Sequence, residues 1–246
     1  MKLRLLCTAL AACIVAVSWP AAAWAQAPGT LVTTIGEQRI TLPLPPDFVE
    51  PEGPATMVTD MLRDALSENY RLIALRVPKS YVDGLRAHDP AASMSRYCTI
   101  LSYRKYEASG MSPELFAQIR KALREQADKV LKLAESQGAS AADRMSRDVA
   151  RRTGDATTSL KIGTSRSLGV IAERPSGFAL ATIGPVSISS KHVNESGDQV
   201  TVVAVALVHG KPVNANFYAD YHSQADLAWA EDQARDWLGR IAELNP

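Results

Sequence analysis

The sequence predicts an α+β fold in which a mostly antiparallel sheet carries helices on both of its faces, an α/β/α sandwich. The first observation is residues 200–208, where both alternating sets of side chains are apolar, as in a strand covered on two sides. A His-Gly-Lys-Pro turn and the alternating run 213–219 follow, which predicts an antiparallel partner strand. The second observation is a pair of amphipathic stretches, 112–136 and 223–243, that supply one helical layer for each face.

The chain begins with the pattern of a secretory signal peptide. Lys2 and Arg4 precede an apolar run over 5–17, and a small-x-small sequence ends at Ala25, so we expect cleavage after Ala25. The letters Leu-Ala-Ala-Cys ending at Cys13 offer an alternative, lipoprotein processing. Only a short apolar segment precedes Cys13 and another follows it, which favours the first interpretation.

Removal of this segment fixes the charge and the cysteine content of the exported chain, 26–246, which we interpret as a single domain. Loss of Lys2 and Arg4 from 27 basic residues leaves 25 against 26 acidic ones, without the positive excess of nucleic-acid-binding proteins. Cys98 is then the sole cysteine, so no intramolecular disulfide can form. No later apolar run is long enough to cross a bilayer, which predicts a soluble or peripheral protein, periplasmic or secreted.

The first part of the exported chain alternates short strands and helices. Gly36 separates two β-branched runs, which predicts a hairpin, and the prolines that follow cannot join a helix. Helical spacing and then strand-like runs come next. The expected elements are the hairpin 31–42, an irregular segment 43–49, a helix 55–68, a strand 72–77, a helical turn or two at 80–87 and a strand 96–106.

A long helix is expected from 112 to 136. Ser112 can cap it, Pro113 suits the first helical position, and Glu114 faces the positive end of the helix dipole. We expect the helix to end at the Gln-Gly-Ala-Ser sequence around Gly138.

The next segment, within 138–156, is dense in charge and short of large apolar side chains. Asp143–Arg147 and Asp148–Arg152 are each four apart, which predicts a solvated helix or helical linker with internal ion pairs. A functional interpretation is an anion- or lipid-facing patch made of its four arginines, Arg144, Arg147, Arg151 and Arg152.

From residue 157 the period changes to two, which predicts strands at 158–162, 168–172, 178–183 and 186–190 before 200–208. Turns are expected at Gly184-Pro185 and at 194–198. The sequence Ser-Gln-Ala-Asp starting at Ser223 resembles a capping box and opens the last helix. The buried side of that helix is expected to consist of Leu227, Ala230, Ala234, Trp237, Leu238 and Ile241.

No motif for catalysis, cofactor binding or metal binding stands out, and we predict no residue for any of these roles. Serine nucleophile elbows and glycine-rich phosphate loops are absent. Cys98 falls mid-strand among apolar neighbours, where we expect a buried, inert thiol. The histidines lack partners at ligand spacing: His88, His192, His209 and His222. Isolated carboxylates are Asp83, Asp89 and Glu107, and strand-associated tyrosines, expected in the core or in cross-strand pairs, are Tyr97, Tyr103, Tyr106, Tyr218 and Tyr221.

The order of these patterns resembles one family of exported proteins. An opening hairpin, the Leu-Pro-Leu-Pro-Pro-Asp-Phe sequence over 42–48, the strand pair 200–219 and the final amphipathic helix are similar to the PsbP/DcrB-like superfamily. The resemblance implies an α/β/α sandwich around an antiparallel sheet and a non-enzymatic role in the cell envelope. It supplies no catalytic signature, and segments 55–68 and 141–155 depart from the compact family pattern.

We therefore expect an exported, non-catalytic accessory or binding protein of the envelope, whose partner is an envelope protein or a small ligand. The alternative is an envelope hydrolase with an unconventional site that uses His209 or His222 with nearby carboxylates.

Overall fold

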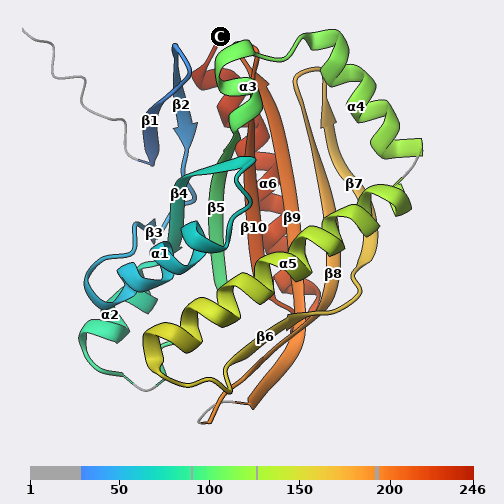
Figure 1. Cartoon of the computed structure of the whole chain (residues 1–246). Helices are drawn as coiled ribbons and strands as arrows, with labels where there is room; N and C mark the ends of the chain where they lie inside the picture. Colours follow the sequence, from blue (N-terminus) through green and yellow to red (C-terminus); the bar gives the residue numbers. More distant parts are fainter. Residues whose placement is uncertain (1–28, 90, 126, 192–193) are drawn as a thin grey trace, which may run out of the picture.

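The computed structural model describes residues 29–246 apart from residues 90, 126 and 192–193; the expected signal peptide and Cys13 lie outside this range. Within it, an eight-stranded sheet has the order β3-β4-β5-β10-β9-β8-β6, with β7 also paired to β8 (Figure 1). Each of these pairs is antiparallel, which confirms the α+β fold class. The strands are β3 (Phe48–Val49), β4 (Tyr70–Pro78), β5 (Arg96–Tyr103), β6 (Ser159–Ile162), β7 (Arg166–Arg174), β8 (Gly177–Ser189), β9 (Asn194–Val208) and β10 (Lys211–Asp220).

One face of the sheet is covered by α6 (Gln224–Leu244), which lies along β9 and β10 (Figure 1). Small side chains on both sides of this contact, such as Ala204 and Ala234, let the helix approach the strands closely. The stripe expected on the helix is buried from Ala230 to Ile241, and the alternate residues of β9 that face it are almost fully buried: Val200, Val202, Ala204, Ala206 and Val208.

The expected hairpin closes the edge of this layer. It consists of β1 (Thr30–Ile35) and β2 (Gln38–Pro43), which form a separate two-stranded sheet. Asn245, the residue after α6, is hydrogen-bonded to β2: its side-chain amide accepts from Thr41 N at 2.9 Å and donates to Thr41 O at 2.8 Å.

The opposite face is covered by several shorter helices. Near β4, η1 (Gly53–Ala55), α1 (Thr56–Ala65) and α2 (Lys79–Arg86) pack on Leu75 and Val77. Over β8 and β9, α3 (Arg104–Ser109) and α4 (Pro113–Glu125) pack around Phe178 and Val205. The long helix α5 (Ala127–Thr153) crosses in front of the sheet and contacts α1 and β6 most closely (Figure 1). Both faces therefore carry helices, as expected.

Two helix boundaries were predicted wrongly. The stretch 112–136 is not one straight helix, because α4 and α5 run in different directions (Figure 1), and Gly138 does not end a helix, because α5 runs through it to Thr153. A single interior glycine costs only about 1 kcal/mol, and the alanines after it favour helix. The strand expected over 96–106 ends at Tyr103, and α3 begins at the next residue.

Among the described helices, none has the length and apolar composition that a bilayer-spanning helix requires.

Two expected turns are strand instead. Pro185 lies inside β8, at the point where β8 changes its outer neighbour from β7 to β6, so its missing N–H interrupts no continuous ladder. Residues 194–198 belong to β9 and pair with the far end of β8. The paired β8–β9 arm is consequently longer than the sequence predicted.

Candidate functional site: an arginine groove between α1 and α5

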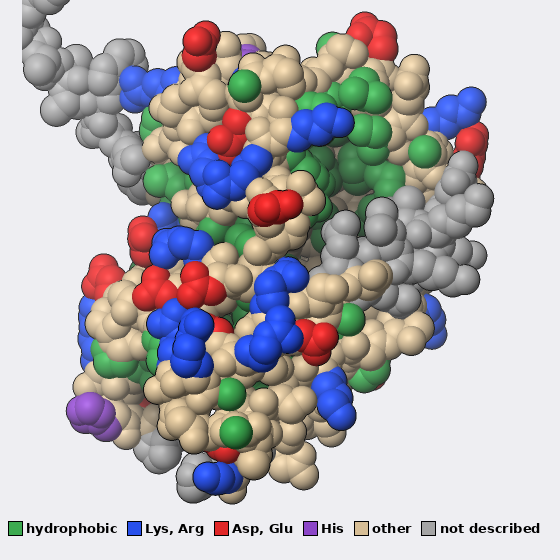
Figure 2. Space-filling view, in the orientation of Figure 1, with side chains coloured by type: hydrophobic (Ala, Val, Ile, Leu, Met, Phe, Trp, Pro, Cys, Tyr) green, Lys and Arg blue, Asp and Glu red, His purple; other side chains and the backbone are tan. Residues whose placement is uncertain are grey.

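The arginine-rich segment lies on α5, opposite the end of α1. Arg144, Arg147 and Arg151 recur at helical spacing and therefore share one side of the helix. With Asp64 of α1 and Asp148 of α5 they line an open hollow of about 290 Å³, here called the arginine groove. Figure 2 shows basic and acidic side chains gathered along this front surface of the molecule.

Arg144 is fixed by the backbone of α1. Its Nε donates to the carbonyl of Ala65, the last residue of α1, at 2.8 Å. The final carbonyls of a helix have no partner within the helix, and a cation there also opposes the negative end of the helix dipole.

Asp148 organises the neighbouring arginines. Its side chain is only 6% exposed and accepts from Arg151 and, at 2.5 Å, from Arg152 Nε. Burial opposes ionisation of Asp148, but the hydrogen bonds from Arg152 and Arg151 outweigh it and lower the pKa of the carboxyl below its usual value. Arg152 also lies 2.8 Å from Asp64 on α1, so this ion pair joins α5 to α1.

Arg147 differs from its neighbours. Its side chain is exposed, and no hydrogen bond or ion pair joins it to any residue that the structure describes. The predicted pair Asp148–Arg152 is confirmed, whereas the predicted pair Asp143–Arg147 does not form. Around the groove, the four guanidinium groups face two carboxylates, which leaves an excess of two positive charges.

This arrangement suits binding of an anion. Guanidinium groups donate through planar forks that match phosphate and carboxylate oxygens. The residues that line the groove include no serine, cysteine or histidine that could act as a nucleophile or base. Across the described residues, no group of three or more His, Cys, Asp or Glu side chains is placed to hold a metal ion.

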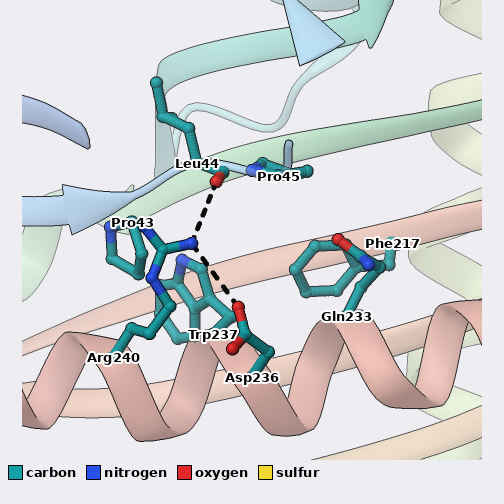
Figure 3. Close-up of a pocket in the computed structure, with 8 residues that line it drawn as sticks. All are labelled: Pro43, Leu44, Pro45, Phe217, Gln233, Asp236, Trp237 and Arg240. Carbon is teal, nitrogen blue, oxygen red and sulfur yellow. Dashed lines mark hydrogen bonds and ion pairs between the residues drawn. The ribbon is translucent and has the colours of Figure 1, made fainter. Parts of the chain in front are cut away.

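A second hollow, at the proline segment, is a packing joint. There Arg240 of α6 donates to Leu44 O at 3.3 Å and lies 3.5 Å from Asp236 Oδ2, above Trp237 (Figure 3). It encloses no space that a water molecule could fill. These contacts attach the proline segment to α6.

The hydrolase alternative placed either His209 or His222 beside nearby carboxylates. His209 and His222 flank the ten-residue strand β10, so about 30 Å separates them. Nε2 of His209 lies 3.4 Å from the backbone oxygen of Pro246. Near His222, burial raises the pKa of Asp220, and Asp226 is engaged in capping α6. His88 is exposed, and His192 lies outside the described residues.

The remaining residues of interest have structural surroundings. Cys98 is fully buried on β5, as expected, and burial raises the pKa of its thiol. Glu107 accepts from Arg71 and Ser102, and Asp83 pairs with Lys79 and Arg86. The predicted cross-strand tyrosine pairing is present in Tyr97 and Tyr218, whose ring centroids lie 4.3 Å apart, while exposed Asp89 accepts from Ala91 N.

The sequence pointed to the arginines but not to their partners on α1. Asp64 and Ala65 belong to an ordinary amphipathic helix, and no local pattern indicates that its end meets α5. Sequence spacing also could not show that Arg147 is left without Asp143.

Comparison with known proteins does not assign the chain to a family. No protein-family model matches the chain, and no curated protein is similar to it. A mutant of the protein Mog1 is a similar solved structure, with 11% identity, 88% of this chain and 92% of that chain covered, and a TM-score of 0.33. At that TM-score the likeness supports no functional argument, and the PsbP/DcrB-like resemblance stays a prediction.

Proposed function

We propose that this protein is an exported, non-catalytic accessory protein of the cell envelope that binds a phosphate-bearing ligand through the arginine groove. Export is supported by the signal-peptide pattern that ends at Ala25. A binding role, rather than turnover, is supported by a lining made of arginines and carboxylates alone.

The observation that carries the proposal is the unpaired guanidinium of Arg147 beside two guanidiniums that other groups already hold. Arg144 is fixed by the Ala65 carbonyl and Arg151 by Asp148. A ligand that meets side chains already in place loses less conformational entropy when they become ordered around it. Phosphate oxygens could accept from Arg147 without breaking any of the described ion pairs.

The test is titration of the processed protein with inorganic pyrophosphate by calorimetry, at low and at high salt. Arg147→Glu should weaken binding at least about tenfold, because it replaces an attractive charge by a repulsive one. Affinity for the unaltered protein should fall as salt rises, since the groove is open to solvent.

Arg174→Glu is the matched control. It makes the same change of charge at an exposed arginine of β7 that lies beside Gly239 of α6, on the opposite face of the sheet. It should leave pyrophosphate binding unchanged. Equal loss in both variants would show a non-specific charge effect, and the proposal would then be wrong.

The hydrolase alternative has its own test. A panel of ester, peptide and glycan substrates should show no turnover by the processed protein. Turnover that His222→Ala or His209→Ala abolishes would instead establish an enzyme.

A further inference from the structure

The end of the sheet beyond α5 is amphipathic in a way that leaves apolar side chains uncovered. β6 and the outer part of β8 alternate apolar and polar residues, with lysine and serines on one face. The other face, here called the strand-tip patch, consists of Leu160, Ile162, Val186 and Ile188. Phe178 and Leu180 occupy the same face further along β8, under α4, so the strand-tip patch faces the helix layer of α4 and α5.

Cross-strand register makes these four side chains one cluster. Leu160 lies opposite Ile188, and Ile162 lies opposite Val186, so the two isoleucines are diagonal neighbours. Ile162 is 36% exposed and Ile188 is 39% exposed, large fractions for isoleucine. Leu160 and Val186 are half-buried, whereas the two isoleucines remain exposed.

The strand-tip patch lies beside the arginine groove. Ser146 Oγ accepts from Leu160 N at 2.8 Å, so β6 lies directly against the turn of α5 that carries Arg147. Ile162 is two residues from Leu160, a rise of about 6.6 Å along a strand. Figure 2 shows basic side chains along α5 and isolated hydrophobic side chains on the surface below it.

We propose that the strand-tip patch and the arginine groove form one docking surface for an anionic bilayer. Arg147 and its neighbours bind phosphate headgroups, while Ile162 and Ile188 enter the boundary between headgroups and acyl chains. This inference rests on the proposed function and names the source of the phosphate as membrane lipid.

The charge of this surface distinguishes a bilayer from other occupants. A second copy docked face to face would bring two groups of excess arginines together, which repel. A free phosphate compound would use the groove but would leave the isoleucines in water. An anionic bilayer satisfies the guanidinium groups and the apolar cluster at once.

The experiment compares two probes on the processed protein, 26–246. One probe is vesicles of phosphatidylglycerol and phosphatidylcholine, with phosphatidylcholine alone for comparison, and binding is measured by flotation. The other is inorganic pyrophosphate. The variant is the double substitution Ile162→Ser and Ile188→Ser, which fits the serine-rich strands, and its folding is checked by circular dichroism.

We expect anionic vesicles to bind and neutral ones not to bind. The double variant should lose vesicle affinity about tenfold and keep pyrophosphate affinity, because only the apolar contribution is removed. Arg147→Glu should lose both. Leu115→Ser, which changes an equally exposed residue (38%) on α4, should bind vesicles as the unaltered protein does.

Three results would overturn the inference. Vesicle binding that the double variant retains would leave the groove as a site for a soluble phosphate, so the proposed function would stand. Loss of a dimer in the double variant, seen by sedimentation, would assign the strand-tip patch to a second copy. Absence of binding to both probes would remove the proposed function as well.

Discussion

Single residues connect parts of this protein that are distant in the chain, and Gly36 is one of them. It forms the turn of the β1–β2 hairpin with φ of 60°, and a Cβ built there would overlap the carbonyl oxygen of Glu107 on α3. Lys211 fixes that same carbonyl from β10 with a 2.8 Å hydrogen bond. The positive φ of Gly36 therefore disfavours any side chain, and Glu107 leaves no space for a Cβ.

We expect Gly36→Ala to lower the free energy of unfolding by about 2 kcal/mol or more, because a backbone clash is added to an unfavourable φ. The measurement is urea unfolding. Gly53→Ala is the matched control, since Gly53 has φ of 58° and nothing within 4 Å of a built Cβ. It should cost about 1 kcal/mol, the strain of the left-handed region alone. Equal costs in the two variants would contradict the contact with Glu107.

At the scale of elements, the start of α6 shows how a helix is fixed to the sheet. Ser223 and Asp226 form the predicted capping box. Asp226 also accepts from Arg96 of β5 at 2.9 Å. The Arg96 hydrogen bond is the main cause that lowers the pKa of Asp226 to about 2, and the backbone N–H groups of His222 and Ser223 add to it.

This pKa predicts how acid affects stability. The folded pKa of about 2 lies below the value of about 3.9 for an unfolded aspartate, so the ionised carboxylate stabilises the fold above that unfolded value. The contribution is lost as pH falls from about 4 towards 2. Asp226→Asn should therefore be less stable than the unaltered protein at pH 7, and the difference should shrink at pH 2 to 3.

Urea midpoints between pH 2 and 7 measure this difference. Asp232→Asn is the control, because its side chain is on the same helix, is 73% exposed and pairs with Arg235. Its effect should be small and constant. A constant difference for Asp226→Asn across this range would show that the capping carboxylate does not cause the pH dependence.

At the scale of the whole molecule, one sheet joins all the helical layers. β9 supplies Val202 to the core under α6 and Val205 to the cluster under α4. Its neighbour β10 pairs with β5, which pairs with β4 beneath α1 and α2. If any one helical layer were removed, apolar side chains would be exposed on strands against which the other layers also pack.

We therefore expect a chain of residues 26–246 to unfold in one cooperative transition. Trp229 and Trp237, the two tryptophans of that range, both lie on α6, so fluorescence follows one face of the sheet. Far-ultraviolet circular dichroism follows every helix, including α5 on the other face. The two urea curves should coincide. Helical signal that survives the fluorescence change would mean that α1 and α5 form a separate unit.

The sequence by itself determined the α+β class, the doubly covered strand at 200–208, the C-terminal helix with its cap, and the existence of an arginine-rich helical segment. These features follow from hydrophobic periodicity and from helix capping, both of which depend on residues close together in the chain. Only the tertiary structure decided that α5 continues through Gly138, that β8 continues through Pro185, and that Arg147 lacks an ion pair beside Asp64. Each of these depends on a neighbour far away in the chain, because packing and pairing outweigh the weak local preference of a glycine, a proline or a charged pair.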